Sequence, residues 1–134
     1  LYNRAKAYVA MSQYEQAIGD LTPLAKEVRT AIGAESKYLL ADCRYRLGHL
    51  DQAEAEVMSF AGMNTQQQYW LARALVLLSD INMRRGDDFQ ARQYLLTLQA
   101  NYHGQDDIAT MVSERIAALD EKEREQVVEP ESED

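Results

Sequence analysis

The residues best suited to chemistry in this 134-residue chain are a single cysteine and two histidines. Cys43 and His49, with Asp51 close behind, come nearest to a metal site or an activated thiol. Their spacing differs from that of zinc motifs, and the chain has no second cysteine to share a metal. Cys43 also lies four residues from both Leu39 and Leu47, which places it on the apolar face of a helix. We therefore expect a buried structural thiol there, with no metal or nucleophilic site.

Two acidic pairs are candidates for calcium ligation. Asp87-Asp88 and Asp106-Asp107 each stand where a helix is expected to begin. Carboxylates at a helix N-terminus accept hydrogen bonds from free backbone amides, so capping is the favoured interpretation. His103 falls at the end of an expected helix, where we expect a structural role. The chain contains no glycine-rich phosphate loop, nucleophile elbow or paired-cysteine motif, so we expect no enzyme activity, no cofactor and no bound metal.

The net charge of −8 is unevenly distributed. Residues 120–134 hold eight acidic and two basic side chains, a net −6, which leaves −2 (−8 + 6) for residues 1–119. Neither part has the basic stripe that nucleic acid requires, and an anionic membrane surface is disfavoured for the same reason. No apolar run approaches the roughly 18 residues of a membrane span, so we expect no direct membrane insertion.

Apolar spacing at helical intervals predicts seven helices. In order, they are one ending near Met11, one reaching Val28, then 35–47, 50–60, 66–85, 87–102 and 106–125. Gly33 is expected to end the first pair, and Gly48 and Gly86 to supply left-handed turns. The acidic residues 126–134 are predicted to form a disordered tail.

Two capping-box patterns and an internal proline give further information on where the helices start and bend. Residues 12–15 and 65–68 each begin with a hydroxyl residue and end with Glu or Gln, which is the pattern of a capping box. Pro23 stands inside the second expected helix, where a missing amide donor favours a kink. The alternative is that the regular part of that helix starts at Pro23.

Small residues recur with a long period. The alanines at 17, 53 and 91 are separated by 36 (53 − 17) and 38 (91 − 53) residues. Each follows, by twelve residues, another small residue: Ala5, Ala41 or Ser79. A period of this size in a helix-forming sequence is typical of a helical solenoid, where small side chains mark close helix crossings. The sequence therefore predicts three helix pairs followed by a final helix.

This pattern resembles the tetratricopeptide repeat (TPR) family over roughly residues 1–103. The matching positions are Ala5, Tyr8, Tyr14, Ala17, Leu21 and Leu24, then Leu40, Ala41, Gly48, Leu50, Ala53, Val57 and Phe60, then Leu78, Ser79, Gly86, Ala91, Leu95 and Leu98. Ser12 departs from the family pattern because it replaces the first turn glycine. The resemblance implies a right-handed α-α superhelix, with repeats at about 1–33, 34–64 and 65–103 and a capping helix at 105–125.

The end of the third repeat carries a narrower resemblance. Residues 86–91, 102–104 and 106–108 are similar to repeat proteins of gut-type Bacteroidetes bacteria, in which such a segment closes a long envelope-associated array. This implies a bacterial protein of the cell envelope or periplasm. The cytoplasm stays open as the alternative, because a single cysteine does not fix the compartment.

In the TPR family, the first helix of each pair lines a concave surface that binds peptides. By resemblance, the groove residues here are Tyr2, Lys6 and Val9, then Tyr38, Asp42, Tyr45 and Arg46, then Arg73, Val76, Asp80, Met83 and Arg84. Tyrosine and arginine are enriched at binding hot spots, so we expect a non-catalytic scaffold for a peptide or protein partner. The Asn and Lys set that clamps a free C-terminal carboxylate in chaperone-binding members is missing, which disfavours that ligand.

A structural role is the alternative. The chain would then be a self-assembly segment of a longer repeat array, without peptide binding of its own. Leu1, Ala5 and Tyr8 are expected to leave an apolar edge where another repeat would stack. We accordingly expect further repeats before Leu1 in a longer protein, and a homodimer through this edge when the chain is alone.

Overall fold

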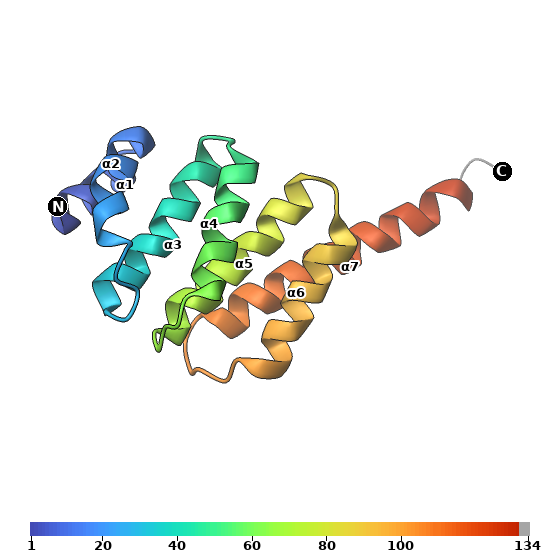
Figure 1. Cartoon of the computed structure of the whole chain (residues 1–134). Helices are drawn as coiled ribbons and strands as arrows, with labels where there is room; N and C mark the ends of the chain where they lie inside the picture. Colours follow the sequence, from blue (N-terminus) through green and yellow to red (C-terminus); the bar gives the residue numbers. More distant parts are fainter. Residues whose placement is uncertain (132–134) are drawn as a thin grey trace.

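The computed structural model describes residues 1–131, and within that range it contains seven α-helices and no strands (Figure 1). The helices are α1 (Tyr2–Ala10), α2 (Tyr14–Leu24), α3 (Ala31–Arg46), α4 (Leu50–Gly62), α5 (Gln68–Arg84), α6 (Asp88–Asn101) and α7 (Ile108–Glu131). The predicted all-α class is confirmed. The helices also follow the expected order, although several boundaries differ from the expected ones.

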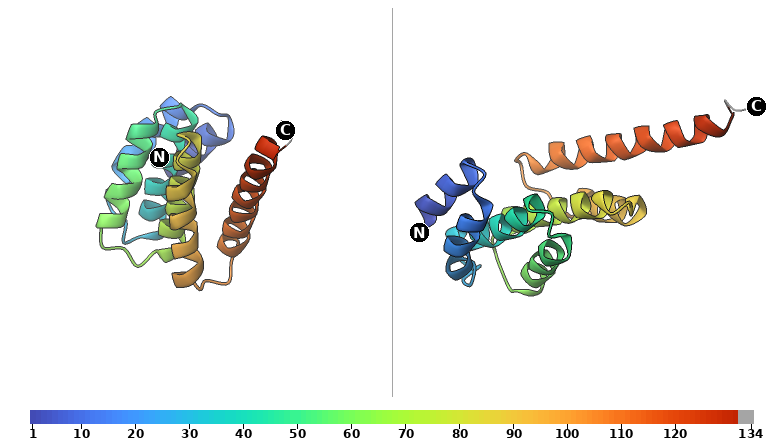
Figure 2. Two further views of the ribbon diagram at one scale, coloured as in Figure 1. Left: turned by 90° about the vertical axis from the view of Figure 1, so that its right-hand side faces the viewer. Right: turned by 90° about the horizontal axis from the view of Figure 1, so that it is seen from above.

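The helices stack as successive hairpins, α1–α2, α3–α4 and α5–α6, with α7 at the end (Figures 1 and 2). Each even-numbered helix contacts its own partner and the first helix that follows it. The odd-numbered helices also contact one another in succession, so α1, α3, α5 and α7 form one layer. We call the side of this layer turned away from the even-numbered helices the odd-helix face.

All three hairpins turn through the same backbone motif. Ser12, Gly48 and Gly86 have positive φ angles of 58°, 81° and 83°. Each donates its N–H to the carbonyl three residues back at 2.9–3.0 Å, and the next residue donates to the carbonyl five residues back at 2.8–2.9 Å. These bonds satisfy the last carbonyls of the first helix in each pair. Ser12 is therefore the counterpart of the two glycines. The capping box expected at 12–15 is wrong, because the N-cap of α2 is Gln13 and makes no side-chain cap bond.

The small residues mark the close crossings, as predicted. Ala5, Ala17, Ala41, Ala53, Ser79 and Ala91 are all 0% exposed. The apolar clusters around them extend beyond single hairpins: Leu40 and Cys43 of α3 belong to the cluster that α1 and α2 form. Neighbouring hairpins therefore share their cores, and the chain folds as one continuous stack.

Gly33 lies inside α3, so its expected role as a helix terminator is wrong. The side chain of Thr30 caps α3 by accepting a hydrogen bond from the N–H of Gly33 at 3.0 Å. The segment before α3 crosses over this first turn, and a Cβ at position 33 would lie 1.8 Å from the carbonyl oxygen of Glu27. The glycine is needed for this close backbone approach, and α3 consequently begins four residues before the expected start at Glu35 (35 − 31).

The end of α2 also differs from the expectation. The helix ends at Leu24, directly after Pro23, and does not reach Val28. Val28 is nevertheless buried, with 4% exposure, and its carbonyl oxygen accepts a hydrogen bond from the Thr65 hydroxyl at 2.6 Å. Thr65 thus ties the α2–α3 linker to the α4–α5 linker. It does not form the expected capping box, because α5 begins at Gln68 after an N-cap that makes no side-chain bond.

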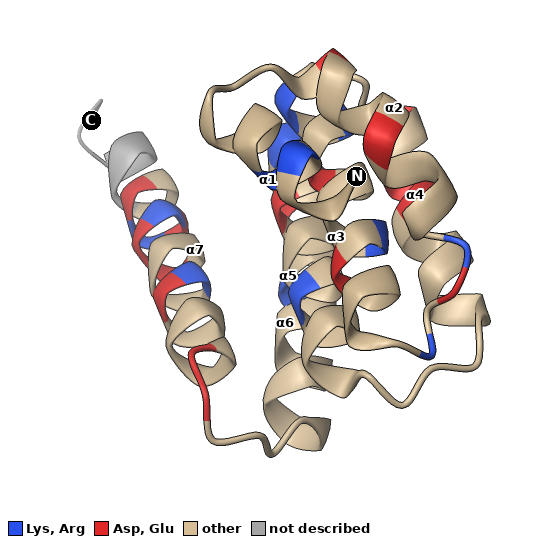
Figure 3. Ribbon diagram, turned by 90° about the vertical axis from the view of Figure 1, so that its left-hand side faces the viewer, with Lys and Arg blue, Asp and Glu red and all other residues tan. Residues whose placement is uncertain are grey.

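The last helix extends beyond the expected capping helix. Continuing past residue 125, α7 reaches Glu131, so only residues 132–134 of the expected disordered tail lie outside the described residues. Closely spaced acidic and basic residues lie along its middle turns (Figure 3). Three ion pairs hold its second half to α6: Arg92 with Asp120 at 2.7 Å and with Glu123 at 3.2 Å, and Lys122 with Asp88 at 2.8 Å.

The expected apolar edge at the first helix is wrong in two of its three members. Ala5 is fully buried, and Tyr8 is half-buried beneath the guanidinium of Arg4, 5.9 Å from its ring centroid. Leu1 is exposed, and so is Met11, at 61% and 57%. The homodimer stays a prediction, with these two side chains as its remaining apolar contacts.

Alanine substitutions at two helical glycines test the close approach of the Glu27 carbonyl to the first turn of α3. We expect Gly33→Ala to lower the free energy of unfolding by about 1–3 kcal/mol, because the new methyl group overlaps the Glu27 carbonyl. Gly19→Ala is the matched control, since no atom lies within 4 Å of its Cβ position. It should raise stability by about 0.5–1 kcal/mol. Urea unfolding followed by circular dichroism measures both, and equal effects would contradict the crossing.

Candidate functional site

The predicted groove residues converge on a cleft between α3, α5 and α7. The cleft has a volume of about 160 Å³ and is lined by Tyr38, Asp42, Tyr45, Arg46, Arg73, Val76, Leu77, Asp80, Met111 and Arg115. Seven of the twelve predicted residues are among them, all from α3 and α5. Helical periodicity brings these side chains together, because residues three or four apart share one face of each helix.

The three α1 residues of the predicted groove lie outside the cleft. Tyr2 donates its hydroxyl to Glu35 at 2.6 Å, and the ammonium of Lys6 pairs with the same carboxylate at 2.9 Å. Val9 packs against the α1–α2–α3 core. These side chains already have partners within the chain, and Glu35, which sequence reasoning missed, joins α1 to α3.

Two predicted residues at the end of α5 also lie outside the cleft lining. Met83 is half-buried and packs against the α5–α6–α7 core. Arg84 donates a hydrogen bond to the Tyr45 carbonyl oxygen at 3.1 Å, and its guanidinium lies 5.3 Å from the centroid of the Tyr45 ring. Arg84 therefore supports one wall of the cleft from outside.

The third wall comes from a helix that sequence reasoning left out of the site. Arg115 of α7 donates to both carboxylate oxygens of Asp80, at 2.8 and 3.0 Å. Met111 lies one turn earlier on the same face of α7. The sequence does contain a signal for this wall: Arg115 lies on the same helical face as the apolar residues Ile108 and Met111, so a basic side chain is expected on the inward face.

An arginine held among aromatic rings dominates the cleft. The Arg73 guanidinium carbon lies 4.8 Å from the ring centroid of Tyr38, 5.8 Å from that of Trp70 and 5.9 Å from that of Tyr69. Its terminal nitrogens donate to the Tyr69 hydroxyl at 3.0 Å and to the Tyr38 hydroxyl at 3.1 Å. Tyr69 and Trp70 also meet edge to face, with their centroids 4.9 Å apart. These contacts hold the guanidinium in one position.

The other charges of the cleft are arranged in pairs. Asp42 accepts a hydrogen bond from Arg46 one turn later at 3.4 Å, and Asp80 is engaged by Arg115. Burial raises the pKa of the Asp42 carboxyl, although Arg46 opposes that effect. Three arginines and two aspartates line the cleft and sum to +1 (3 − 2), within a chain of net charge −8. The cleft is thus a locally cationic site in an acidic protein.

Cys43, Asp87 and Asp106, which were among the residues first considered for chemistry, have structural roles. Cys43 is fully buried, as predicted, and burial raises the pKa of its thiol to about 12. The Asp87 side chain accepts from the Gln90 N–H at 3.1 Å, and Asp106 accepts from the first amide of α7 at 3.0 Å, so the predicted caps are confirmed. Among the residues whose side chains the structure describes, no three His, Cys, Asp or Glu are grouped to hold a metal ion.

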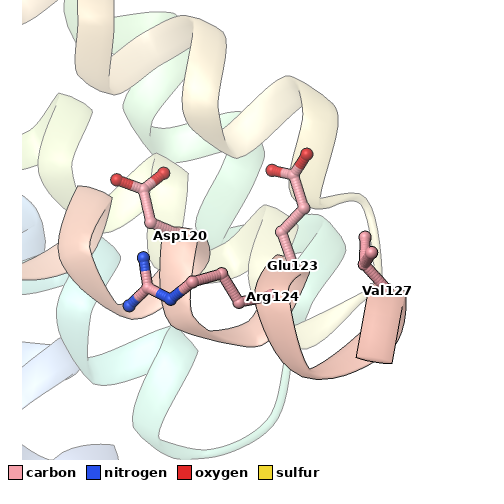
Figure 4. A pocket seen from close by; sticks show the side chains of 4 residues that line it. All are labelled: Asp120, Glu123, Arg124 and Val127. Carbon is pink, nitrogen blue, oxygen red and sulfur yellow. The ribbon is translucent and has the colours of Figure 1, made fainter. Parts of the chain in front are cut away.

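A hollow on α7 makes a poorer site. It is lined by Asp120, Glu123, Arg124 and Val127 (Figure 4). All four belong to one helix, and both acidic members are already engaged by Arg92 of α6.

Comparison with known proteins adds no relative. No family model matches the chain, and no curated protein or solved structure matches it at a significant level. None of the helices within residues 1–131 combines the length and the apolar character needed to cross a membrane.

Two aspartates whose pKa values are shifted in opposite directions, Asp42 and Asp20, provide a test of the electrostatics. Burial raises the pKa of Asp42, so its ionised form opposes folding, and we expect Asp42→Asn to raise the free energy of unfolding at neutral pH. The gain should grow as the pH rises from the ordinary carboxyl value of 3.8 through the raised pKa of the folded state. Below that window, both states are protonated and the gain vanishes.

Asp20→Asn is the control with the opposite sign. The hydrogen bonds from Arg4 lower the pKa of Asp20, so its ionised form supports folding. This substitution should lower stability at neutral pH, by an amount that shrinks as acid protonates the native carboxylate. Chemical unfolding at a series of pH values measures both variants. Destabilisation by both substitutions with the same pH dependence would contradict the assignment for Asp42.

Proposed function

We infer that the chain is a non-catalytic interaction module that binds a segment of a protein partner along its odd-helix face. The observation that carries this proposal is the cleft between α3, α5 and α7, where Arg73 is held among Tyr38, Tyr69 and Trp70. Arginine, tyrosine and tryptophan are enriched at binding hot spots, where they bury large areas, and tyrosine and tryptophan also lose little freedom on binding.

The chemistry of the lining supports binding over catalysis. The described cleft residues supply charges, phenol hydroxyls and apolar surface, and they include no His, Ser, Thr, Cys or Lys. General bases and nucleophiles are most often drawn from those types, and otherwise from Asp, Glu and Tyr, held within hydrogen-bond reach of a partner that activates them. Asp42 and Asp80, the two carboxylates, are each engaged by an arginine.

The repeat architecture supports a tetratricopeptide-type superhelix as the finer assignment. Three hairpins share one turn motif, and their odd-numbered helices contact each other in succession. The first helices of the hairpins would then line the inner surface of the superhelix. In this proposal α7 closes the array as the capping helix, and its contacts with α5 and α6 support that role.

A cleft-filling substitution tests the proposed function. Peptides selected from a random library against the whole chain should shift the amide NMR signals of α3, α5 and α7. We expect Met111→Trp to weaken their binding about tenfold or more, because the larger ring occupies the 160 Å³ cleft. Met58→Trp makes the same change at a side chain of α4 that is 50% exposed, and it should leave the affinity unchanged.

Circular dichroism and unfolding curves would verify that both tryptophan variants keep the fold. Peptides that shift only α4 and α6, or that bind folded Met111→Trp as tightly as the native chain, would contradict a binding role for the odd-helix face.

A further inference from the structure

We propose that the cleft recognises the carboxylate of an Asp or Glu side chain within the partner segment, and that Arg73 binds this carboxylate. The inference rests on the proposed function and narrows it from protein binding in general to acidic segments. It follows from hydrogen-bond donors, charge and space in the cleft.

The donor count singles out Arg73. A guanidinium has five N–H donors, and the phenol hydroxyls of Tyr38 and Tyr69 accept two of those of Arg73. Arg46 and Arg115, the other two cations of the cleft, each have an aspartate partner. Within the described residues, no carboxylate lies within the 4.0 Å ion-pair distance of Arg73. The surplus charge of +1 in the cleft therefore belongs to Arg73.

The position of this guanidinium favours binding of a planar anion. Three aromatic rings and two phenol hydroxyls fix it before any ligand arrives. A free arginine side chain loses considerable rotamer freedom when it is bound, and here much of that loss has already occurred on folding. The arginine fork matches the two oxygens of a carboxylate, which gives direction as well as charge.

The surrounding charges favour a carboxylate over a phosphate. Asp42 and Asp80 line the same cleft, and they would repel a phosphate dianion more strongly than a carboxylate monoanion. The cleft has a volume of about 160 Å³, against roughly 30 Å³ for one liquid water, so it has room for one side chain and not for a longer stretch of the partner. The site therefore fits one acidic side chain of a segment that passes over the cleft.

Peptides that differ only in charge test the proposal. The probes are a hexaglutamate and a hexaglutamine peptide, both acetylated and amidated so that no terminal charge takes part. Each is titrated into the whole chain at low salt, and amide NMR shifts report the site and the affinity. We expect hexaglutamate to shift the amide signals of α3 and α5 around the cleft. Hexaglutamine should bind more weakly by a factor of about ten or more.

Two arginine variants assign the effect to one residue. Arg73→Gln should weaken hexaglutamate binding about tenfold or more, whereas Arg29→Gln should leave it unchanged. Arg29 is the control because the same charge is removed from the α2–α3 linker, where its guanidinium pairs with Glu27 outside the cleft lining. Should Arg73→Gln fail to fold, Arg73→Lys keeps the charge without the fork, and we expect it to weaken binding severalfold.

Other results would overturn the inference. Equal binding of the two peptides, hexaglutamate binding that Arg73→Gln does not change, or shifts confined to another surface would each do so. Tighter cleft binding by a phosphoserine peptide than by hexaglutamate would overturn the preference for carboxylate. If library-selected peptides bind the cleft without acidic side chains and regardless of Arg73, the proposed function stands and this inference fails.

Discussion

The close approach of paired helices at six small, fully buried side chains is the constraint on which the rest of the structure depends. A larger side chain at any of these positions would force the helices apart, since packed interiors tolerate little added volume. Because neighbouring hairpins share their apolar clusters, the spacing within one hairpin also sets the position of the next. The cleft inherits its geometry from this stacking, because α3 and α5 belong to successive hairpins.

Local patterns were sufficient to predict much of the fold. The repeating small residues and the turn glycines Gly48 and Gly86 report on interactions between residues close in the chain, so periodicity reveals them. Gly33 and Val28 were misassigned because their environments depend on another segment: Glu27 crosses over the first, and Thr65 bonds the second. Ser12 is a third case. Serine commonly caps helices, but here it occupies the left-handed position of the α1–α2 turn, which glycine occupies in the other two hairpins.

The site was predictable along each helix but less so between helices. Spacing placed Tyr38, Asp42 and Arg46 on one face of α3, and the structure keeps them together. Spacing does not reveal which charges meet across helices. Lys6 was assigned to the groove, yet it pairs with Glu35, and Arg115 reaches Asp80 from thirty-five residues away in the sequence. Such pairings depend on how the helices stack, and a helical wheel carries no information about that.

The two halves of α7 are held by different forces. The half that walls the cleft, with Met111 and Arg115, packs through Ile108 and Val112 into the apolar cluster shared with α5 and α6, which added salt leaves largely intact. The outer half is held to α6 by partly exposed pairs such as Arg92–Asp120, whose attraction mobile ions weaken. Concentrated electrolyte therefore loosens the outer turns of α7 and leaves the walls around the Arg73 guanidinium in place.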